Sequence, residues 1–303
     1  MKQRVYERLV AELDEKRVFL SEPMKKHTTF RIGGPADYFV TPKSGEEVER
    51  AVAICKEEKV PYYIVGNGSN LLVSDAGYRG AVIQIFKEMS GVQVREDSIQ
   101  AQAGASLAKI AAAALDAGLT GFEFAAGIPG TLGGACVMNA GAYGGEMKDV
   151  LVNVTVLDDS GKVQKIEKEN LELGYRTSVI AKKGYIVLGA EIQLQEGNPE
   201  EIRGLMNELK EKRVSKQPLE YPSAGSTFKR PEGYFAGKLI QDTGLRGFRV
   251  GDAMVSEKHC GFVINIGEAS AAEVDLLMRQ VSEQVQAKFG VTLEPEVKRL
   301  GEF

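Results

Sequence analysis

Apolar residues recur at every third or fourth position in several stretches of the chain, which is the spacing of helices that bury one face. The opening stretch places Val5, Leu9 and Leu13 on such a face. A second helix is predicted after Ser44, because Glu47 follows three residues later and the pair has the spacing of a capping box. Further helices are predicted from Ser106 to Gly118 and near residues 199–213, 233–243 and 271–289.

Shorter apolar runs bounded by turn residues predict strands. Between residues 150 and 195 these runs alternate apolar and polar positions, as at Val152, Val154 and Val156. This region is therefore expected to form an antiparallel sheet. The other predicted strands are Pro61–Val65, Ala81–Ile85, Val263–Ile266 and Val291–Val297, and Thr28–Pro35 is predicted as a strand followed by a turn.

The segment Gly197–Glu201 has the features of a place where a new domain begins. It combines a turn at Gly197, a polar N-cap at Asn198, a proline at the first helical position and an acidic first turn. We therefore expect a domain boundary near residue 196.

Composition and charge exclude several classes of partner. The chain has 303 residues, of which 43% are hydrophobic and 26% charged, so it is long enough for two or three globular domains. Its formal net charge of −4 argues against nucleic acid and anionic membranes, which require a broad basic surface. The first eight residues are charged and lack the apolar core of a signal peptide, so we expect a cytoplasmic protein with no membrane insertion.

The chain has too few cysteines and histidines for most disulfide, metal or catalytic sites that depend on these residues. Cys55, Cys136 and Cys260 are widely spaced and odd in number, so neither a disulfide framework nor a zinc site is indicated. His27 and His259 are the only histidines, which disfavours a histidine-based metal site and a Ser-His-Asp triad. We therefore expect no bound metal, and we expect other residue types to carry the chemistry.

Two glycine-rich segments are the strongest sign of a ligand. They are Gly66–Asn70 and Gly127–Gly134, and their converging backbone N–H groups could hold a phosphate or a pyrophosphate. Neither segment completes the G-x-G-x-x-G pattern or is followed by Gly-Lys-Ser/Thr, so the common dinucleotide and Walker sites are disfavoured. Either segment alone is better explained by a tight turn, but two in one chain reverse that preference and favour a dinucleotide.

Seven motifs occur in register over nearly everything from Thr28 onward. They are Thr29–Gly34, Val65–Asn70, Ala126–Ala135, Asn139–Gly144, Gly174–Ser178, Ala224–Phe228 and Leu293–Val297. Together they resemble the UDP-N-acetylenolpyruvoylglucosamine reductase family. The resemblance implies an α+β protein, with a two-subdomain FAD-binding fold of the vanillyl-alcohol-oxidase/PCMH type and a third α/β substrate-binding domain. We expect these domains at residues 1–64, 65–195 and 196–303.

The same resemblance implies non-covalent FAD, reduced by NADPH, and a small nucleotide-sugar as the substrate. In the family the two glycine segments hold the pyrophosphate and ribityl chain of FAD, and a third segment lines the flavin. We also expect the chain to act as a monomer. The implied cofactor contacts are Val65, Gly66, Asn67, Gly68, Ser69, Asn70, Gly127, Ile128, Pro129, Gly130, Gly133, Gly134, Asn139, Ala140, Gly141 and Ala142.

The resemblance also implies a reaction and three catalytic residues. Reduced flavin passes hydride to an enolpyruvyl double bond, giving UDP-N-acetylmuramate for peptidoglycan precursors. Arg176 aligns with the arginine that stabilises the developing enolate, and a planar guanidinium suits a carboxylate. Ser226 aligns with the proton donor, and Glu296, predicted on the last strand, aligns with the acid that shares the stabilisation of the enol.

Two further residues are expected to contact the substrate or the nicotinamide phosphates, namely Tyr175 and Lys216. The segment between Arg176 and Ser226 is short, as is the segment after Glu296, so the chain resembles the shorter branch of the family. That branch lacks an inserted loop that carries a tyrosine over the substrate. The sequence therefore leaves open which residues cover the nucleotide-sugar.

Two other functions remain open from the residues alone. One is another flavoenzyme of the same FAD-binding superfamily, many of which tether flavin through histidine or cysteine. Only Cys136 lies near the main glycine segments, which favours a dissociable cofactor. The other is a non-catalytic nucleotide-binding module that uses the same two segments.

Overall fold

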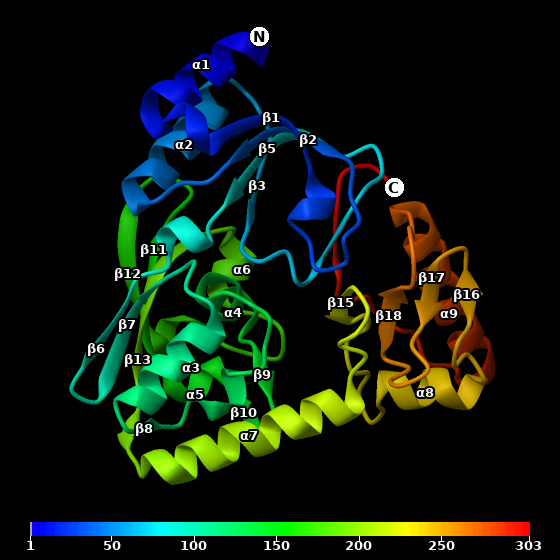
Figure 1. Ribbon diagram of the computed structural model, residues 1–303. Helices are drawn as coiled ribbons and strands as arrows, with labels where there is room; N and C mark the ends of the chain where they lie inside the picture. Colours follow the sequence, from blue (N-terminus) through cyan, green and yellow to red (C-terminus); the bar gives the residue numbers. More distant parts are fainter. Residues whose placement is uncertain (1) are drawn as a thin grey trace. The chain divides into compact units, whose positions relative to one another are not determined.

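The computed structural model describes residues 2–303 of the chain (Figure 1). The backbone divides into two compact units, each assembled from three separate stretches of sequence. The three-domain division expected from the sequence stays a prediction. The first unit comprises Met1–Leu20, Tyr38–Asn67 and Gly80–Arg213, and the second comprises Ser21–Asp37, Gly68–Arg79 and Val214–Phe303.

The N-terminal part of the chain contains two helices and a four-stranded sheet of order β1-β2-β5-β3. Val5, Leu9 and Leu13 are buried on the first helix, as their spacing predicts. Strand β3 pairs in parallel with β5. The elements are α1 (Lys2–Leu13), β1 (Val18–Pro23), β2 (Pro35–Val40), α2 (Gly45–Glu57), β3 (Tyr62–Val65), β4 (Leu71–Val73) and β5 (Tyr78–Gln84).

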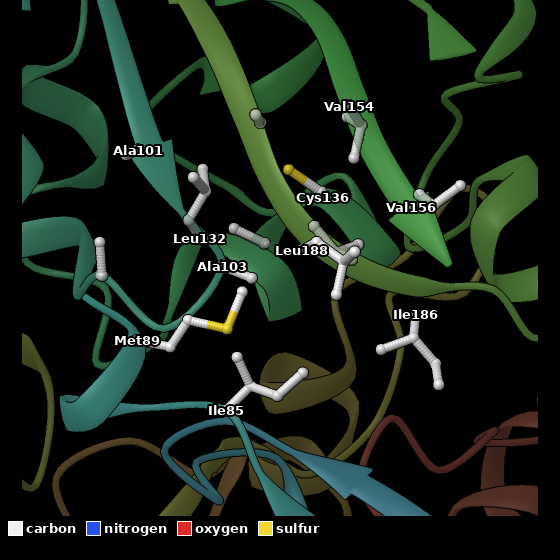
Figure 2. Close-up of a cluster of buried hydrophobic side chains, with 14 of the residues drawn as sticks. Ile85, Met89, Ala101, Ala103, Leu132, Cys136, Val154, Val156, Ile186 and Leu188 are labelled. Carbon is white, nitrogen blue, oxygen red and sulfur yellow. The ribbon is translucent and has the colours of Figure 1, made fainter. Parts of the chain in front are cut away.

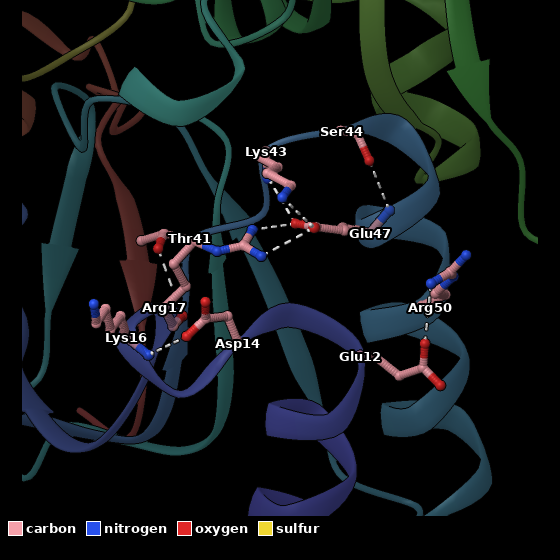
Figure 3. Close-up of polar contacts among 9 residues, drawn as sticks. All are labelled: Glu12, Asp14, Lys16, Arg17, Thr41, Lys43, Ser44, Glu47 and Arg50. Atoms are coloured by element: carbon pink, nitrogen blue, oxygen red, sulfur yellow. Dashed lines mark hydrogen bonds and ion pairs between the residues drawn. The ribbon is translucent and has the colours of Figure 1, made fainter.

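The start of α2 differs from the predicted capping box (Figure 3). The Ser44 hydroxyl accepts a hydrogen bond from the Glu47 N–H at 3.2 Å, as expected. The carboxylate of Glu47 does not return to Ser44; it accepts from the Lys43 N–H at 2.9 Å and pairs with the Arg17 guanidinium. The reciprocal half of the box is therefore wrong, because the buried carboxylate pairs with a cation instead.

A five-stranded antiparallel sheet of order β12-β11-β13-β7-β6 dominates the rest of the first unit. The antiparallel sheet predicted for residues 150–195 is thus confirmed. The elements are β6 (Val92–Arg95), β7 (Ser98–Gln102), α3 (Leu107–Asp116), β8 (Leu119–Thr120), α4 (Leu132–Met138), β9 (Gly141–Ala142), β10 (Gly145–Glu146), α5 (Met147–Val150), β11 (Leu151–Leu157), β12 (Val163–Glu167), α6 (Val179–Lys183), β13 (Ile186–Gln193) and β14 (Gln195–Glu196).

One face of this sheet packs against α4 (Figure 2). Val154 and Val156 on β11 are fully buried, and Leu132 and Cys136 of α4 are fully buried in the same cluster. Each such aliphatic side chain contributes about 1.5–3 kcal/mol to folding. This core fixes α4, and with it the glycine segment that precedes the helix.

The second unit holds a four-stranded sheet of order β15-β18-β17-β16 and a parallel pair, β4 with β19. Ser270 and Glu273 form the predicted capping box of α9, and Gly290 ends the helix at φ +69°. The elements are α7 (Pro199–Lys216), which starts in the first unit, then β15 (Ser223–Ser226), α8 (Ala236–Thr243), β16 (Arg249–Val250), β17 (Ala253–Val255), β18 (Phe262–Asn265), α9 (Ala271–Phe289) and β19 (Lys298–Leu300).

Two predicted strands are wrong. Thr28–Gly34 forms turns and irregular backbone, because Arg31 and Gly33 take positive φ values of +56° and +134° that no strand admits. Val291–Val297 makes only an isolated bridge between Pro295 and Phe228, and the strand begins after it, at Lys298. Proline has no N–H for a ladder, so pairing is interrupted there.

Candidate active site

The first glycine segment, Gly66–Asn70, follows β3 and has unused backbone donors. No acceptor within the described chain pairs with the N–H groups of residues 67–70. Gly68 has φ +61°, and a Cβ there would lie 2.1 Å from the His27 carbonyl oxygen, so only glycine fits. Consecutive free N–H groups in a turn are what a pyrophosphate needs. The segment therefore fits the phosphates of a dinucleotide.

The second glycine segment, Gly127–Gly134, is built differently. The N–H groups of Leu132 and Gly133 donate to the Ala105 and Ala103 carbonyls at 2.8 Å, so they hold the protein together. At Gly130 and Gly134 an added Cβ would meet no atom closer than 3.8 and 3.6 Å. Internal packing does not require glycine at these two positions. This segment thus offers space beside a ligand, while the first offers the donors.

A side-chain contact joins the two segments within the first unit. The Asn67 amide nitrogen donates to the Pro129 carbonyl at 2.8 Å. A Cβ on Gly66 would lie 2.3 Å from the Thr131 hydroxyl, so the chain approaches closely here. The position of Asn67 is thereby fixed relative to Pro129.

Asn139 is expected to line the flavin, but its side-chain amide makes three hydrogen bonds within the protein. Its amide nitrogen donates to the Glu146 carboxylate at 2.8 Å and to the Gly174 carbonyl at 3.2 Å, and its oxygen accepts from the Lys148 N–H at 2.8 Å. It is 1% exposed, at φ +45°. Only its backbone is left for a cofactor, and its side chain positions the turn that carries Arg176.

That turn holds Arg176 in a left-handed conformation. Gly174 and Thr177 exchange both backbone hydrogen bonds, and Arg176 between them has φ +54°. The Ser178 hydroxyl donates to the Val137 carbonyl at 2.6 Å, which fastens the turn to α4. A non-glycine residue held at positive φ costs about 1 kcal/mol or more and is often found at functional sites.

The surroundings of Arg176 contain an aromatic ring and a carboxylate. The guanidinium carbon lies 5.1 Å from the ring centroid of Tyr175, which is 52% exposed. The Lys148 ammonium, by hydrogen bonding, does most to hold the pKa of Glu146 below its usual value, and the Asn139 amide and the Arg176 charge add to the effect. Arg176 is thus presented on a turn whose geometry is set by its neighbours.

Ser226 ends β15 of the second unit immediately after a bulge. Ser223 pairs with Ile264 and Ser226 with Phe262, so the two residues between them on β15 face a single residue on β18. Gly225 in this bulge has φ +75°, a value that favours glycine. Bulges redirect side chains, and the Ser226 side chain is exposed.

Thr227 connects Ser226 with Glu296. Its N–H donates to the Gly261 carbonyl and its own carbonyl accepts from the Glu296 N–H, both at 2.8 Å. Asn70 of the first glycine segment donates from its side chain to the Glu296 carbonyl at 3.2 Å. Glu296 is 8% exposed and lies in the irregular stretch before β19, so its predicted place on a strand is wrong.

The structure therefore groups the expected site residues in two sets. Ser226, Glu296 and Asn70 lie together in the second unit, while Arg176 and Tyr175 lie beside Asn139 in the first. Val65 ends β3, and Val65 and Ala140 are both buried, so their contact with the cofactor stays a prediction. Lys216 is exposed at the last position of α7.

Sequence reasoning missed two residues at these loops. A Cβ on Gly127 would lie 3.2 Å from the Cδ of Arg213, so the arginine stem covers this glycine. Burial lowers the pKa of Arg213, and no carboxylate in the described chain pairs with its guanidinium. Thr29 donates to the Ser223 carbonyl at 2.6 Å. Both are long-range contacts of residue types that are common on surfaces, so no local signal marks them.

Residues 2–303 hold no group of three His, Cys, Asp or Glu side chains close enough together to bind a metal ion. The three cysteines are buried, and burial raises the pKa of both Cys55 and Cys136 to about 12. Among the described helices, none combines the length and the apolar character needed to cross a membrane.

Comparison with known proteins decides the family. Residues 36–167 match the model of an FAD binding domain, and residues 217–300 match the C-terminal domain of UDP-N-acetylenolpyruvoylglucosamine reductase. The reductase of Agathobacter rectalis is 54% identical, with 100% of both chains covered. This chain belongs to the UDP-N-acetylenolpyruvoylglucosamine reductase family. The family member of Clostridioides difficile is 52% identical over 99% of both chains.

Solved structures support the fold. The UDP-N-acetylenolpyruvylglucosamine reductase of Thermus caldophilus has a TM-score of 0.81 and 39% identity, covering 94% of this chain and 99% of its own. Phl p 4, a glucose dehydrogenase, reaches a TM-score of 0.52 at 15% identity, covering 97% of this chain and 58% of its own, which indicates a shared fold alone. The full-length match to reductases favours that family over the other two hypotheses.

Proposed function

We propose that this chain reduces the enolpyruvyl group of UDP-N-acetylglucosamine enolpyruvate to the lactyl ether of UDP-N-acetylmuramate, with NADPH as reductant, for peptidoglycan synthesis. The observation that carries this proposal is the cluster of Ser226, Glu296 and Asn70 in one unit of a chain matched along its full length by these reductases. We also propose that the enzyme works in the cytoplasm as a monomer.

FAD is the cofactor, and the two glycine segments fit it. The free N–H groups of residues 67–70 suit its pyrophosphate, and an added Cβ at Gly130 or Gly134 would meet little of the protein, so these glycines leave room for a ligand at their own segment. Arg213, a partly buried cation on Gly127, is suited to an anionic part of the same ligand. Bound there, FAD would supply the hydride chemistry, by carrying a hydride from NADPH to the terminal carbon of the enolpyruvyl group.

Residues of this chain stabilise the negative charge that develops on the substrate when the hydride is added. Electron density collects on the carbon next to the carboxylate of the substrate and on the carboxylate itself. Arg176 binds that carboxylate with its planar, permanently charged guanidinium. Glu296, a buried carboxyl group, shares in holding the enolate by sharing a proton with it.

Ser226 gives the proton to the carbon. A hydroxyl group is a very weak acid, but a developing carbanion is basic enough to take its proton. The bulge at Gly225 presents Ser226 outward, and the Thr227 contacts hold the backbone that carries it. A serine held outward on a fixed backbone suits proton donation better than nucleophilic attack, which needs an adjacent base.

Rapid mixing of Ser226→Ala with each substrate in turn tests this assignment. NADPH should bleach the flavin absorbance at the wild-type rate, because Ser226 takes no part in that step. The return of colour on adding UDP-N-acetylglucosamine enolpyruvate should slow by about 10²–10⁴-fold, the usual contribution of a positioned acid. Ser98→Ala, which changes an exposed strand serine of the first unit, is the matched control and should behave as wild type. Wild-type recovery in Ser226→Ala would remove the serine from the mechanism.

A further inference from the structure

The second unit exposes two aromatic rings shortly after Ser226. Phe235 is 61% exposed, more than any other large hydrophobic side chain in residues 2–303, and the adjacent Tyr234 is 47% exposed. Exposed neighbouring rings lose the stabilisation that burial provides, so such a pair often marks a binding surface.

Arg230 stacks on the more exposed ring. Its guanidinium carbon lies over the Phe235 ring, 3.9 Å from the centroid, close enough for a cation–π contact. The arginine Nε also donates to the Tyr234 carbonyl at 3.2 Å, which closes the loop 230–234. The two planar groups are therefore positioned together in the absence of any ligand.

The loop is held firmly at both ends. On the Ser226 side, Phe228 bridges Pro295, and the Lys229 N–H donates to the Glu294 carbonyl at 2.8 Å while its ammonium pairs with the Glu294 carboxylate. On the other side, Phe235 is the N-cap residue of α8. A surface fixed in this way loses little entropy when a ligand binds.

The backbone of Gly261 contacts both the helix that follows this surface and the residue next to the proposed proton donor. A Cβ on Gly237, in the first turn of α8, would lie 3.1 Å from the Gly261 N, so the helix start packs on Gly261. The carbonyl of the same Gly261 accepts from Thr227, next to Ser226. Phe235 and Ser226 thus belong to one packed region of the second unit.

We propose that Phe235, with Arg230 stacked on it, is the surface on which the uracil base of the nucleotide-sugar lies. The inference rests on the proposed function and adds the residues that recognise the nucleotide. A nucleobase stacks well on an aromatic ring, and the guanidinium N–H groups suit the uracil carbonyls or the adjoining diphosphate.

Titration of the FAD-loaded enzyme with UDP tests the surface directly. Phe235→Ala should weaken UDP binding by about 5- to 150-fold, the usual range for one stacked base. Phe235→Trp should retain affinity, whereas Phe235→Leu, which is apolar without a ring plane, should not. Inorganic pyrophosphate, which has no base, should bind equally to wild type and Phe235→Ala.

Phe289→Ala is the matched control. Phe289 is also an exposed ring of the second unit, 37% exposed, with the Lys288 ammonium 5.6 Å from its centroid. This variant should bind UDP as wild type does. Arg230→Lys keeps the charge but loses the flat stack, so it should weaken UDP more than it weakens pyrophosphate.

Steady-state kinetics separate failure of the surface from failure of the proposed function. Phe235→Ala should raise KM for the nucleotide-sugar by a similar factor, with kcat and KM for NADPH unchanged. Unchanged UDP affinity in both Phe235→Ala and Phe235→Leu would overturn the inference, as would an equal loss of pyrophosphate or a rise confined to KM for NADPH. A wild type that binds UDP but does not turn over the enolpyruvyl substrate would contradict the proposed function and leave the UDP result valid.

Discussion

Replacing Asn139 by glycine measures how much one buried side chain contributes to the free energy of unfolding. The residue sits at φ +45°, which glycine adopts without strain, so the substitution removes the amide group and leaves the backbone geometry. Three hydrogen bonds disappear, one of them to the Glu146 carboxylate. The charged bond is worth about 2 kcal/mol and each of the others about 1 kcal/mol. We therefore expect the free energy of unfolding to fall by about 3–4 kcal/mol.

Urea unfolding followed by circular dichroism measures this change. The transition midpoint should fall while its slope stays constant, since the surface exposed on unfolding barely changes. The turn carrying Arg176 also loses the hydrogen bond that Asn139 donates to the Gly174 carbonyl, so kcat should drop while FAD still binds. Asn139→Asp, which keeps one acceptor but places a second carboxylate beside Glu146, should be at least as unstable. A loss below about 1 kcal/mol in Asn139→Gly would refute the view that this side chain organises the turn.

Two other predictions concern the glycine segments and acid stability. Gly134→Ala should leave the apoprotein as stable as wild type but raise the Kd for FAD in a fluorescence titration. Gly66→Ala, whose Cβ would meet Thr131 at 2.3 Å, should instead lower the melting temperature even without FAD. An unchanged FAD affinity in Gly134→Ala would contradict a ligand beside that glycine. Because Lys148 lowers the pKa of Glu146, the stabilisation from this carboxylate is present above its ordinary value of 4.5 and lost as the pH falls through the folded value. Thermal melting across that range should show a shallower acid decline in Glu146→Gln, and an unchanged decline would exclude Glu146 from acid unfolding.

Local signals predicted the helices well. Ser44, Ser106 and Ser270 each accept the expected hydrogen bond from the residue three positions later, because capping depends on neighbours in sequence. The capping box at Ser44 failed in its second half, since the partner of Glu47 is Arg17, which only the fold brings near.

The sequence predicted which residues belong to the site better than it predicted how they are arranged. Motifs pointed to Ser226 and Glu296, but their connection runs through Thr227 and through Asn70, far away in sequence. The failed strand at Val291–Val297 has the same cause: alternation of apolar residues does not show where a pairing partner ends. Side chains such as Arg213 acquire their surroundings only when distant segments meet.

The parallel pairing of β4 with β19 has a consequence for synthesis on the ribosome. Leu71–Val73 is synthesised long before its neighbour Lys298–Leu300. All the residues between the two strands must be made before β4 can pair with β19, so the nascent chain carries β4 without this partner until then. A chaperone that shields apolar strands during translation should therefore raise the yield of active enzyme, and a fragment starting at Val214 should not fold by itself.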